Sequence, residues 1–347
     1  MRRAGRRRVL IAGSVVVAAV AIAAVVIETA LVHGQGGDAG PTELVTLRSG
    51  SYADFRQVLA GEPPAAASVP AMLRFPDRPG DRYPAVVVVH SLGGFQEASE
   101  GWLAAALRRS GFATLTYDSF SARRLGQADL VGARGNPPLA SAVADAFAAL
   151  RLLAGHPRVG ADRVGIVGFS FGGEVAHLTA FETLRSAMAP GPSRFAAHVA
   201  TYPAGAYGVR AEAGAYTGAP ILMLLGEKDD NLPVAKVEGY LAYAEEAGHP
   251  APITMVVYPG AFHAWTVPTL VTPRFYAQYG SMRKCPLVLL GRGAPTWLVD
   301  GREQPLDPDA VAACRAAGSG YTMAFDAATR AHSTAHTASF LERSLRP

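Results

Sequence analysis

Hydrophobic positions divide the body of the chain into short apolar runs that alternate with stretches of helical spacing. Residues 84–89 (PAVVVV) form a continuous, mostly β-branched run, which is typical of a strand buried on both sides in a parallel sheet. The alternation then continues along the chain. The predicted strands are 84–89, 112–117, 163–167, 195–202, 220–225 and 253–258, and the predicted helices are 98–109, 139–154, 172–188 and 234–247.

This alternation predicts the fold class. Strands that alternate with helices need crossover connections, which are right-handed and leave neighbouring strands parallel. We therefore predict an α/β protein with a mostly parallel, doubly wound sheet, preceded by extended runs at 44–47 and 69–75. After the last strand the alternation stops. Residues 266–322 are rich in Pro, Gly and aromatics and predict a loop-rich C-terminal insertion, and Asp326 is the predicted N-cap of a final helix ending near Ser344.

The N-terminal segment has a different pattern. Residues 9–27 contain no charged side chain, and five arginines precede them. This apolar run of 19 residues is close to the roughly 20 that span a bilayer, and it exceeds the roughly 7–15 of a cleavable signal peptide. Its length favours an uncleaved signal anchor. The predicted parts of the chain are a signal segment over 1–33, a Gly-rich linker over 34–42, and one folded domain over 43–347 that includes the insertion 266–322.

The arginines also predict the orientation of this segment. Positive flanking charge stays in the cytoplasm, so the folded domain is expected outside the cytoplasm, attached to the membrane through the N-terminal segment. A cleaved signal is the alternative, because Val32 and Gly34 are small enough for a processing site before Gln35. In that case the domain is exported without an anchor.

Composition narrows the function classes. Half of the 347 residues are hydrophobic and 17% are charged, which allows a large core and excludes a disordered chain. The formal net charge is +4, but residues 1–34 hold five arginines against one glutamate, so the remainder of the chain is neutral. No basic stripe with interleaved aromatic residues follows. Nucleic acid is therefore not an expected partner.

Cysteine and histidine usage bears on cross-links and metals. Cys285 and Cys314 are the only cysteines, and an oxidising compartment would allow them to form a disulfide; the alternative is two buried free thiols. Two cysteines without a nearby histidine cluster do not make a zinc site. His332 and His336 are four residues apart on the final predicted helix but lack a third ligand. We predict no metal site.

The pattern G-x-S-x-G occurs at Gly168-Phe169-Ser170-Phe171-Gly172, between a predicted strand and a predicted helix. A nucleophile on such a sharp turn sits in a strained backbone conformation, which requires that the side chains two before and two after the serine be almost absent. Gly168 and Gly172 meet that requirement, and the helix start points its amides at the site. The sequence therefore predicts Ser170 as a nucleophile; an ordinary Gly-rich turn is the alternative.

A serine nucleophile needs a base and an acid further along the chain, in the order Ser, acid, His. The acid is expected after the strand 220–225, where Asp229 is the first choice, Asp230 the second and Glu227 the third. The base is expected after the next strand. His263 is the histidine that lies in that loop, so we predict it as the general base.

Two further roles follow from the same scheme. The developing oxyanion needs backbone donors, which we expect from the amide of Phe171 and from the amide of Leu92 in the loop after strand 84–89. Arg123 and Arg124 follow another predicted strand and are candidates to bind a substrate carboxylate; solvated surface arginines are the alternative.

These segments together resemble the dienelactone hydrolase family of the α/β-hydrolase superfamily. The resemblance covers about residues 69–265 and the final helix. It implies an α/β-hydrolase fold with Ser170, Asp229 and His263 as the triad. It rests on PAVVVVHSLGG, on Tyr117-Asp118-Ser119-Phe120 followed by Arg123, on Asp145, and on RVGIVGFSFGG, GEKDDNLP and YPGAFHAW.

The chain also departs from that family. Dienelactone hydrolases use a cysteine nucleophile, whereas this chain has Ser170, and the segment around Cys285 to Cys314 is not part of the minimal fold. Because the insertion directly follows the predicted base, we expect it to lie beside or over the acyl pocket and to set specificity. A membrane-tethered domain likewise differs from the usual soluble enzyme.

The sequence therefore predicts a serine hydrolase that cleaves a carboxylic ester or lactone through an acyl-serine intermediate, without cofactor or metal. A small-molecule ester or lactone is the expected substrate. The alternatives are a serine peptidase or thioesterase with the same triad, and a catalytically silent envelope protein that binds lipids or partners on this fold.

Overall fold

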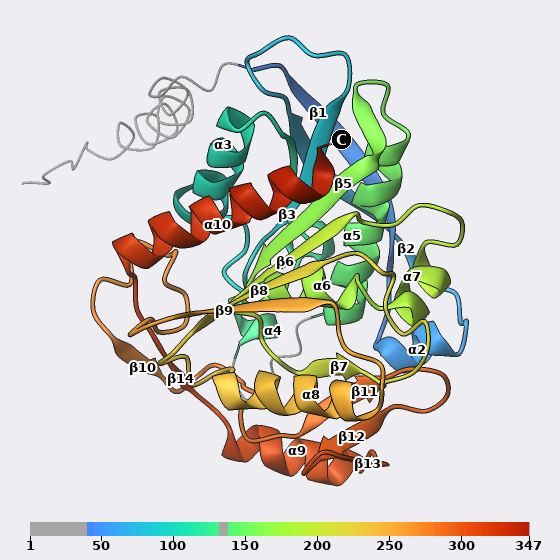
Figure 1. Ribbon diagram of the computed structural model, residues 1–347, viewed down its shortest axis with the longest axis vertical. Helices are drawn as coiled ribbons and strands as arrows, with labels where there is room; N and C mark the ends of the chain where they lie inside the picture. The colour runs from blue at the N-terminus through green and yellow to red at the C-terminus, as the bar shows by residue number, and fades with distance from the viewer. Residues whose placement is uncertain (1–39, 132–137, 347) are drawn as a thin grey trace, which may run out of the picture. The chain divides into compact units, whose positions relative to one another are not determined.

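The computed structural model describes residues 40–131 and 138–346 (Figure 1). The predicted signal segment over 1–33 and most of the linker over 34–42 lie outside these residues. Within the two described ranges, no helix combines the length and the apolar character needed to cross a membrane.

The centre of the domain is an eight-stranded sheet in the order β1-β2-β4-β3-β5-β6-β8-β9 (Figure 1). From β4 to β9 in that order every neighbouring pair is parallel, whereas β1 and β2 pair antiparallel at one edge. The mostly parallel sheet confirms the predicted fold class. The strands are β1 (Thr42–Ser51), β2 (Ala65–Arg74), β3 (Tyr83–Val89), β4 (Ala113–Tyr117), β5 (Val159–Phe169), β6 (Ala197–Thr201), β8 (Ile221–Gly226) and β9 (Ile253–Tyr258).

Helices cover both faces of this sheet, and the alternation of side chains along β3 explains how. Val87 and Val89 belong to the core that contains α5 and α6, whereas Val86 and Val88 belong to the core that contains α3 and α10. A strand covered on both faces has no position for a polar residue, which accounts for the run PAVVVV. The helices are α3 (Trp102–Arg109), α5 (Leu139–Ala154), α6 (Phe171–Leu178), α8 (Val234–Glu246) and α10 (Ala327–Leu345).

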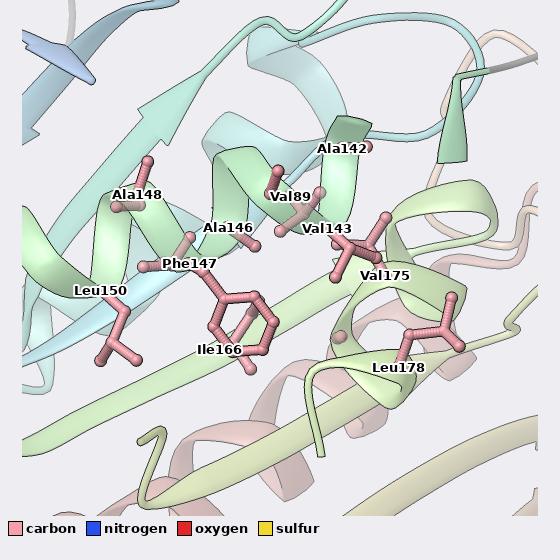
Figure 2. Close-up of a cluster of buried hydrophobic side chains, with 14 of the residues drawn as sticks. Val89, Ala142, Val143, Ala146, Phe147, Ala148, Leu150, Ile166, Val175 and Leu178 are labelled. Atoms are coloured by element: carbon pink, nitrogen blue, oxygen red, sulfur yellow. The ribbon is translucent and has the colours of Figure 1, made fainter. Parts of the chain in front are cut away.

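The larger of these cores lies under α5. Figure 2 shows Phe147 of α5 with Ile166 of β5, and Val175 and Leu178 of α6 beside them. All four side chains are fully buried. Burial of one such side chain stabilises the folded state by about 1.5–3 kcal/mol, so this layer holds β5 and α6, and the turn between them, in a fixed relation.

The predicted helix over 172–188 is wrong in one respect, because it is two helices, α6 and α7 (Glu182–Met188). Phe181 between them is extended and forms a β-bridge with Tyr216, and the backbone N–H of Glu182 donates to Ala215. These long-range backbone bonds take the place of the helical ones. By contrast, the final helix begins where predicted, since Asp326 caps α10 by accepting from the N–H of Thr329.

The insertion carries more regular structure than the loop-rich segment predicted for 266–322. A second sheet in the order β13-β12-β11-β7 joins three of its strands to β7 (Tyr207–Val209) of the main domain, and β10 pairs with β14. These strands were not predicted because each is three or four residues long, which is too short for a recognisable period. The elements are β10 (Arg274–Tyr276), β11 (Leu287–Leu290), β12 (Thr296–Val299), β13 (Arg302–Pro305), α9 (Pro308–Ala317) and β14 (Tyr321–Met323).

Candidate active site

Ser170 occupies the sharp turn between β5 and α6. Its backbone has φ 52° and ψ −111°, a conformation that L-residues rarely adopt. A Cβ at Gly168 would lie 1.9 Å from the carbonyl oxygen of Gly172, and a Cβ at Gly172 would lie 2.5 Å from that of Val89. The two glycines are therefore required by the close approach of the backbone, and the turn presents the serine hydroxyl at the carboxyl end of the sheet.

His263 meets Ser170 at this edge of the sheet. The two residues are 93 positions apart in sequence, and Ser170 Oγ lies 2.8 Å from His263 Nε2. His263 follows β9 and its backbone carbonyl accepts from the N–H of Ala324, so β14 supports the loop that carries it. Both side chains are buried, with residue exposures of 7% for Ser170 and 1% for His263.

Asp229 contacts the other nitrogen of the imidazole, with Oδ2 2.8 Å from His263 Nδ1. Its second oxygen, Oδ1, accepts from the N–H groups of Asn231 and Leu232 at 2.9 and 3.3 Å. An ionised carboxylate only accepts, so Nδ1 carries the imidazole proton and Nε2 is left to accept from the serine hydroxyl. Ser170, His263 and Asp229 thus form one continuous chain of hydrogen bonds.

The two other acidic residues of this loop have different partners. Asp230 Oδ1 accepts from the N–H of Thr322 at 2.7 Å, and Glu227 Oε2 accepts from the N–H of Gly260 at 2.8 Å. Neither carboxylate contacts His263. Of the three acids considered from the sequence, the structure brings Asp229 to the imidazole.

Two tyrosine rings enclose the imidazole, and sequence reasoning missed both. Tyr202 and Tyr321 each approach the ring of His263 edge-on, with centroid distances of 5.0 and 4.9 Å. Burial raises the pKa of both phenols, so both stay uncharged beside the imidazole. Tyr321 comes from β14, so no local pattern could have associated it with the site. The insertion thus contributes directly to the surroundings of His263.

A cavity of about 380 Å³ adjoins Ser170. Leu92 and Phe171 line it together with the serine, so both residues predicted to supply oxyanion donors are on its wall. Phe171 is the first residue of α6, where a backbone N–H has no acceptor within its own helix. Most other lining side chains are apolar, among them Phe55, Leu130, Leu139, Val288, Leu290 and Leu306.

The insertion forms a large part of this cavity wall. Its contribution comes from the loop before β11, from β11 itself, from the loops before β12 and before α9, from α9 and from β14. The residues are Gly280, Ser281, Met282, Val288, Leu290, Pro295, Leu306, Val311, Arg315 and Tyr321. The structure also joins Cys285 and Cys314 by a disulfide, which links the segment before β11 to α9. The segment therefore lies beside the pocket, as the sequence order led us to expect.

The role considered for Arg123 in substrate binding is wrong. Its guanidinium forms a bidentate ion pair with Asp145 at 2.7 and 2.9 Å, and it also donates to Ser51 Oγ and to backbone carbonyls. A buried guanidinium with these partners has no donor left to offer a substrate carboxylate. Arg124 is exposed, and neither arginine lines the cavity. Both serve as structural or surface residues.

Glu174 is another buried group that the sequence analysis did not single out, although an acid in the apolar helix α6 is a readable signal. Its carboxylate accepts from the N–H of Gly205 at 2.6 Å and from that of Tyr207 at 3.0 Å. Burial raises its pKa to about 7. Glu174 therefore holds the segment that leads into β7, and Ala204, Ala206 and Tyr207 of that segment line the cavity.

Comparisons with known proteins agree with this fold. The profile of the dienelactone hydrolase family matches residues 69–278, which is more than half of the chain. No curated protein matches the chain. The structure named m3DLH has 18% sequence identity and a TM-score of 0.53, with 88% of this chain and 100% of that chain covered.

Two other solved structures are similar. The dienelactone hydrolase-like promiscuous phosphotriesterase P91 from metagenomic libraries has 16% identity and a TM-score of 0.51, covering 87% of this chain and 98% of its own. Esterase 2 of Thermogutta terrifontis has 17% identity and a TM-score of 0.45, covering 66% and 85%. At these sequence identities, the similarities to m3DLH and to P91 establish the fold.

The fold is that of an α/β-hydrolase, with a strand–serine–helix turn at the carboxyl edge of the sheet. The chain belongs to the dienelactone hydrolase family, and it is a hydrolase that acts on ester bonds.

Proposed function

We propose that this protein hydrolyses a carboxylic ester or lactone through an acyl-serine intermediate. The observation that carries the proposal is the continuous chain from Ser170 Oγ to His263 Nε2 and from His263 Nδ1 to Asp229 Oδ2, each link 2.8 Å long. A serine hydroxyl is a weak nucleophile at neutral pH, and this arrangement supplies the base that activates it.

In the first half-reaction His263 Nε2 takes the proton of Ser170 Oγ as the oxygen attacks the substrate carbonyl carbon. The carbonyl oxygen becomes an oxyanion, for which the amides of Phe171 and Leu92 are the proposed donors. The carbon–oxygen bond to the alcohol then breaks, and His263 gives its proton to the leaving oxygen. The acyl group stays on Ser170.

In the second half-reaction water replaces the alcohol. His263 takes a proton from the water, whose oxygen attacks the acyl carbon, and it then returns that proton to Ser170 Oγ as the carboxylic acid leaves. Asp229 holds the imidazole in the required tautomer and stabilises its charged form in both halves. Asp229 and His263 are both buried, which keeps competing water from the hydrogen bond between them.

The cavity supports a substrate with a mainly apolar acyl group. Its lining is dominated by aliphatic and aromatic side chains, and its volume is within the range of small-molecule sites. We expect esters of medium-length or aromatic acids to be better substrates than acetate esters. Rates on a panel of acyl chain lengths and lactones measure this directly.

Labelling with a fluorophosphonate probe tests the proposed nucleophile. The probe phosphonylates activated serines, so wild-type protein should be labelled once per chain and Ser170→Ala should not be labelled. Ser281→Ala is the matched control, since Ser281 lines the same cavity but donates to Asn231 and should leave labelling intact. An unlabelled wild-type protein with no esterase activity would instead indicate a silent binding protein.

The reaction class is tested by matched substrates. Ester, thioester and amide versions of the same acyl group separate an esterase from a thioesterase or a peptidase. The proposal expects the ester or lactone to have the highest kcat/KM. A higher value for the amide would replace it with a peptidase.

We also propose that the domain works outside the cytoplasm. The Cys285–Cys314 disulfide supports this, because disulfides form and persist in oxidising compartments. Alkylation of free thiols in freshly isolated protein tests it. Two thiols modified without prior reduction would contradict it.

A further inference from the structure

The loop after β3 is held by two buried ionisable side chains that take no part in the steps above. Glu100 Oε1 accepts from the N–H of Ser91 at 3.0 Å, and His90 Nδ1 lies 2.7 Å from the carbonyl oxygen of Ser91. Both His90 and Glu100 are fully buried. Burial of a polar group costs free energy unless the group is hydrogen-bonded, and both side chains meet this requirement by bonding to the backbone of Ser91.

The hydrogen bonds of His90 determine its tautomer. Its Nε2 lies 3.1 Å from the backbone N of Ser119, and a backbone N–H can only donate. Nε2 is therefore the acceptor, and the ring proton is on Nδ1, which donates to the carbonyl oxygen of Ser91. The ring is also packed edge-on against Phe120, at a centroid distance of 4.6 Å. Asp118 Oδ1 lies 3.6 Å from Nε2, beyond hydrogen-bond distance. His90 cannot rotate without losing its two hydrogen bonds and the contact with Phe120.

The bond from His90 bears directly on the next amide. The Ser91 carbonyl and the Leu92 N–H belong to the same peptide unit, which is trans like every described peptide bond. In a trans peptide the C=O and the N–H point to opposite sides of the plane. The carbonyl oxygen of Ser91 also accepts from the N–H of Gly94 at 3.1 Å, so His90 and Gly94 hold it together, with the shorter contact from His90. This carbonyl directs the N–H of Leu92 to the opposite side of the peptide plane, and Leu92 lines the cavity with Ser170 and Phe171.

We propose that His90 is a positioning residue for catalysis: it orients and polarises the Leu92 amide as an oxyanion donor, and Glu100 supports it by holding Ser91 from the other side. Donation to a carbonyl withdraws electron density from the attached N–H and makes it a stronger donor. The inference rests on the proposed function, because it assumes that an oxyanion forms at Ser170.

The role predicts a specific kinetic effect. A misdirected donor weakens binding of the oxyanion and leaves binding of the uncharged substrate unchanged. Removal of one oxyanion donor costs about 10²- to 10³-fold in kcat, so loss of its orientation should cost about 10- to 100-fold. KM should stay near the wild-type value.

The experiment uses the full-length protein, an activated ester and three variants. His90→Leu removes both ring nitrogens, whereas His90→Asn keeps an amide donor close to the position of Nδ1. His198→Leu is the matched control, because His198 is also fully buried and its Nδ1 lies 3.0 Å from a backbone carbonyl, that of Ala176. Melting temperatures are measured beside kcat and KM.

We expect His90→Leu to lose kcat with KM unchanged, His90→Asn to recover most of that loss, and His198→Leu to lower the melting temperature without lowering kcat. Affinity for a trifluoromethyl ketone, whose serine adduct carries an oxyanion, should fall by the same factor as kcat in His90→Leu. Equal loss of kcat in His90→Leu and His198→Leu, unchanged kcat in His90→Leu, or no recovery in His90→Asn would overturn the proposal.

The same assay separates this inference from the function on which it rests. If Ser170→Ala is inactive and unlabelled while His90→Leu has wild-type kcat, the positioning role alone is wrong. If Ser170→Ala keeps wild-type activity, the acyl-serine mechanism itself is wrong.

Discussion

The two sides of the cavity are built in different ways. On the core side, Leu92, Ser170 and Phe171 stand at the carboxyl ends of β3 and β5, two adjacent strands in the middle of the main sheet. On the other side, residues between 280 and 321 reach the cavity from several loops, two short strands and a helix. A disulfide and a second sheet hold that side together.

This difference separates chemistry from substrate choice. Strands covered on both faces position the reacting groups rigidly, so changes there should act on kcat. The insertion side contains short strands and a disulfide, and its residues line the cavity without belonging to the triad. Changes there should therefore act on stability and on KM. The two sides of the cavity are joined where the main domain leads into the second sheet through β7. Glu174 lies at this joint, because it belongs to α6 and its carboxylate holds the segment before β7.

The largest effect is expected on the core side, from Asp229→Asn. An amide at this position can place its NH₂ toward Nδ1, which favours the wrong imidazole tautomer and leaves Nε2 unable to accept from Ser170. We expect kcat to fall by about 10⁴-fold with little change in KM. Steady-state kinetics on an activated ester measure this.

Asp230→Asn is the control for that experiment, because Asp230 bonds to Thr322 of the insertion and not to His263. Its kcat should stay within the same order as wild type. A larger loss of kcat in Asp230→Asn than in Asp229→Asn would contradict the assignment of catalysis to the core side.

The next largest effect is expected on the insertion side, from replacing both cysteines with serine. The disulfide closes a loop with a sequence separation of 29, which corresponds to about 3–4 kcal/mol of folding free energy. Cys314 also lies on α9 between Val311 and Arg315, which line the cavity. We expect lower stability in urea and a higher KM for bulky esters, with kcat on a small ester retained.

Reduction of the wild-type disulfide should reproduce the effect of the double cysteine variant. Unchanged stability and KM after full reduction would show that the cross-link does not organise this side of the cavity.

At the joint, Glu174→Gln should change the dependence of stability on pH. Burial raises the pKa of Glu174 from 4.5 to about 7, so the folded protein holds the proton more tightly than the unfolded chain. The free energy of unfolding should therefore fall as pH rises from 4.5 to 7, by about 1.4 kcal/mol for each unit of pKa difference. The glutamine variant lacks this contribution.

The effect of Glu174 is obtained as the difference between the unfolding free energies of wild type and Glu174→Gln at each pH, because other groups also titrate. Burial lowers the pKa of His177 to about 3 and that of His198 to about 4, which makes stability rise with pH over part of the same range. Urea denaturation of wild type and Glu174→Gln at pH 5 and pH 8 cancels that term. Parallel curves for the two proteins would contradict the assignment.

The smallest effect is expected from filling the insertion side of the cavity. Val311→Trp on α9 should lower kcat/KM for long acyl chains by about 10- to 100-fold and leave short-chain esters nearly unaffected. Ala312→Trp is the control, since Ala312 is exposed and does not line the cavity. An equal loss on short and long chains would mean that this side does not select the acyl group.

Much of the core side could be predicted from the sequence. The buried run at β3, the helix α5 and the cap at Asp326 depend on side-chain periodicity and on local hydrogen bonds, which neighbouring residues encode. The turn at Ser170 was readable for the same reason, because Gly168 and Gly172 answer a steric requirement within five residues.

Other features depended on contacts between distant segments. The sequence favoured Asp229 over Asp230 as the catalytic acid but gave no structural reason. The structure supplies one, because Asp230 accepts a hydrogen bond from the backbone N–H of Thr322, 92 residues away. Arg123 was a candidate to bind a substrate carboxylate, because the sequence does not show that its guanidinium pairs with Asp145. Tyr321 carried no signal at all.

Local sequence patterns were sufficient to predict the alternating strands and helices from β3 to β9, the strained serine turn and the chain order of serine, acid and histidine. The tertiary structure decided which side chains face one another, which charges are already paired, and how the insertion closes one side of the cavity. The physical reason is range: periodicity and steric fit act between near neighbours, whereas pairing and burial across the domain depend on strand register and on the packing of segments far apart in the chain.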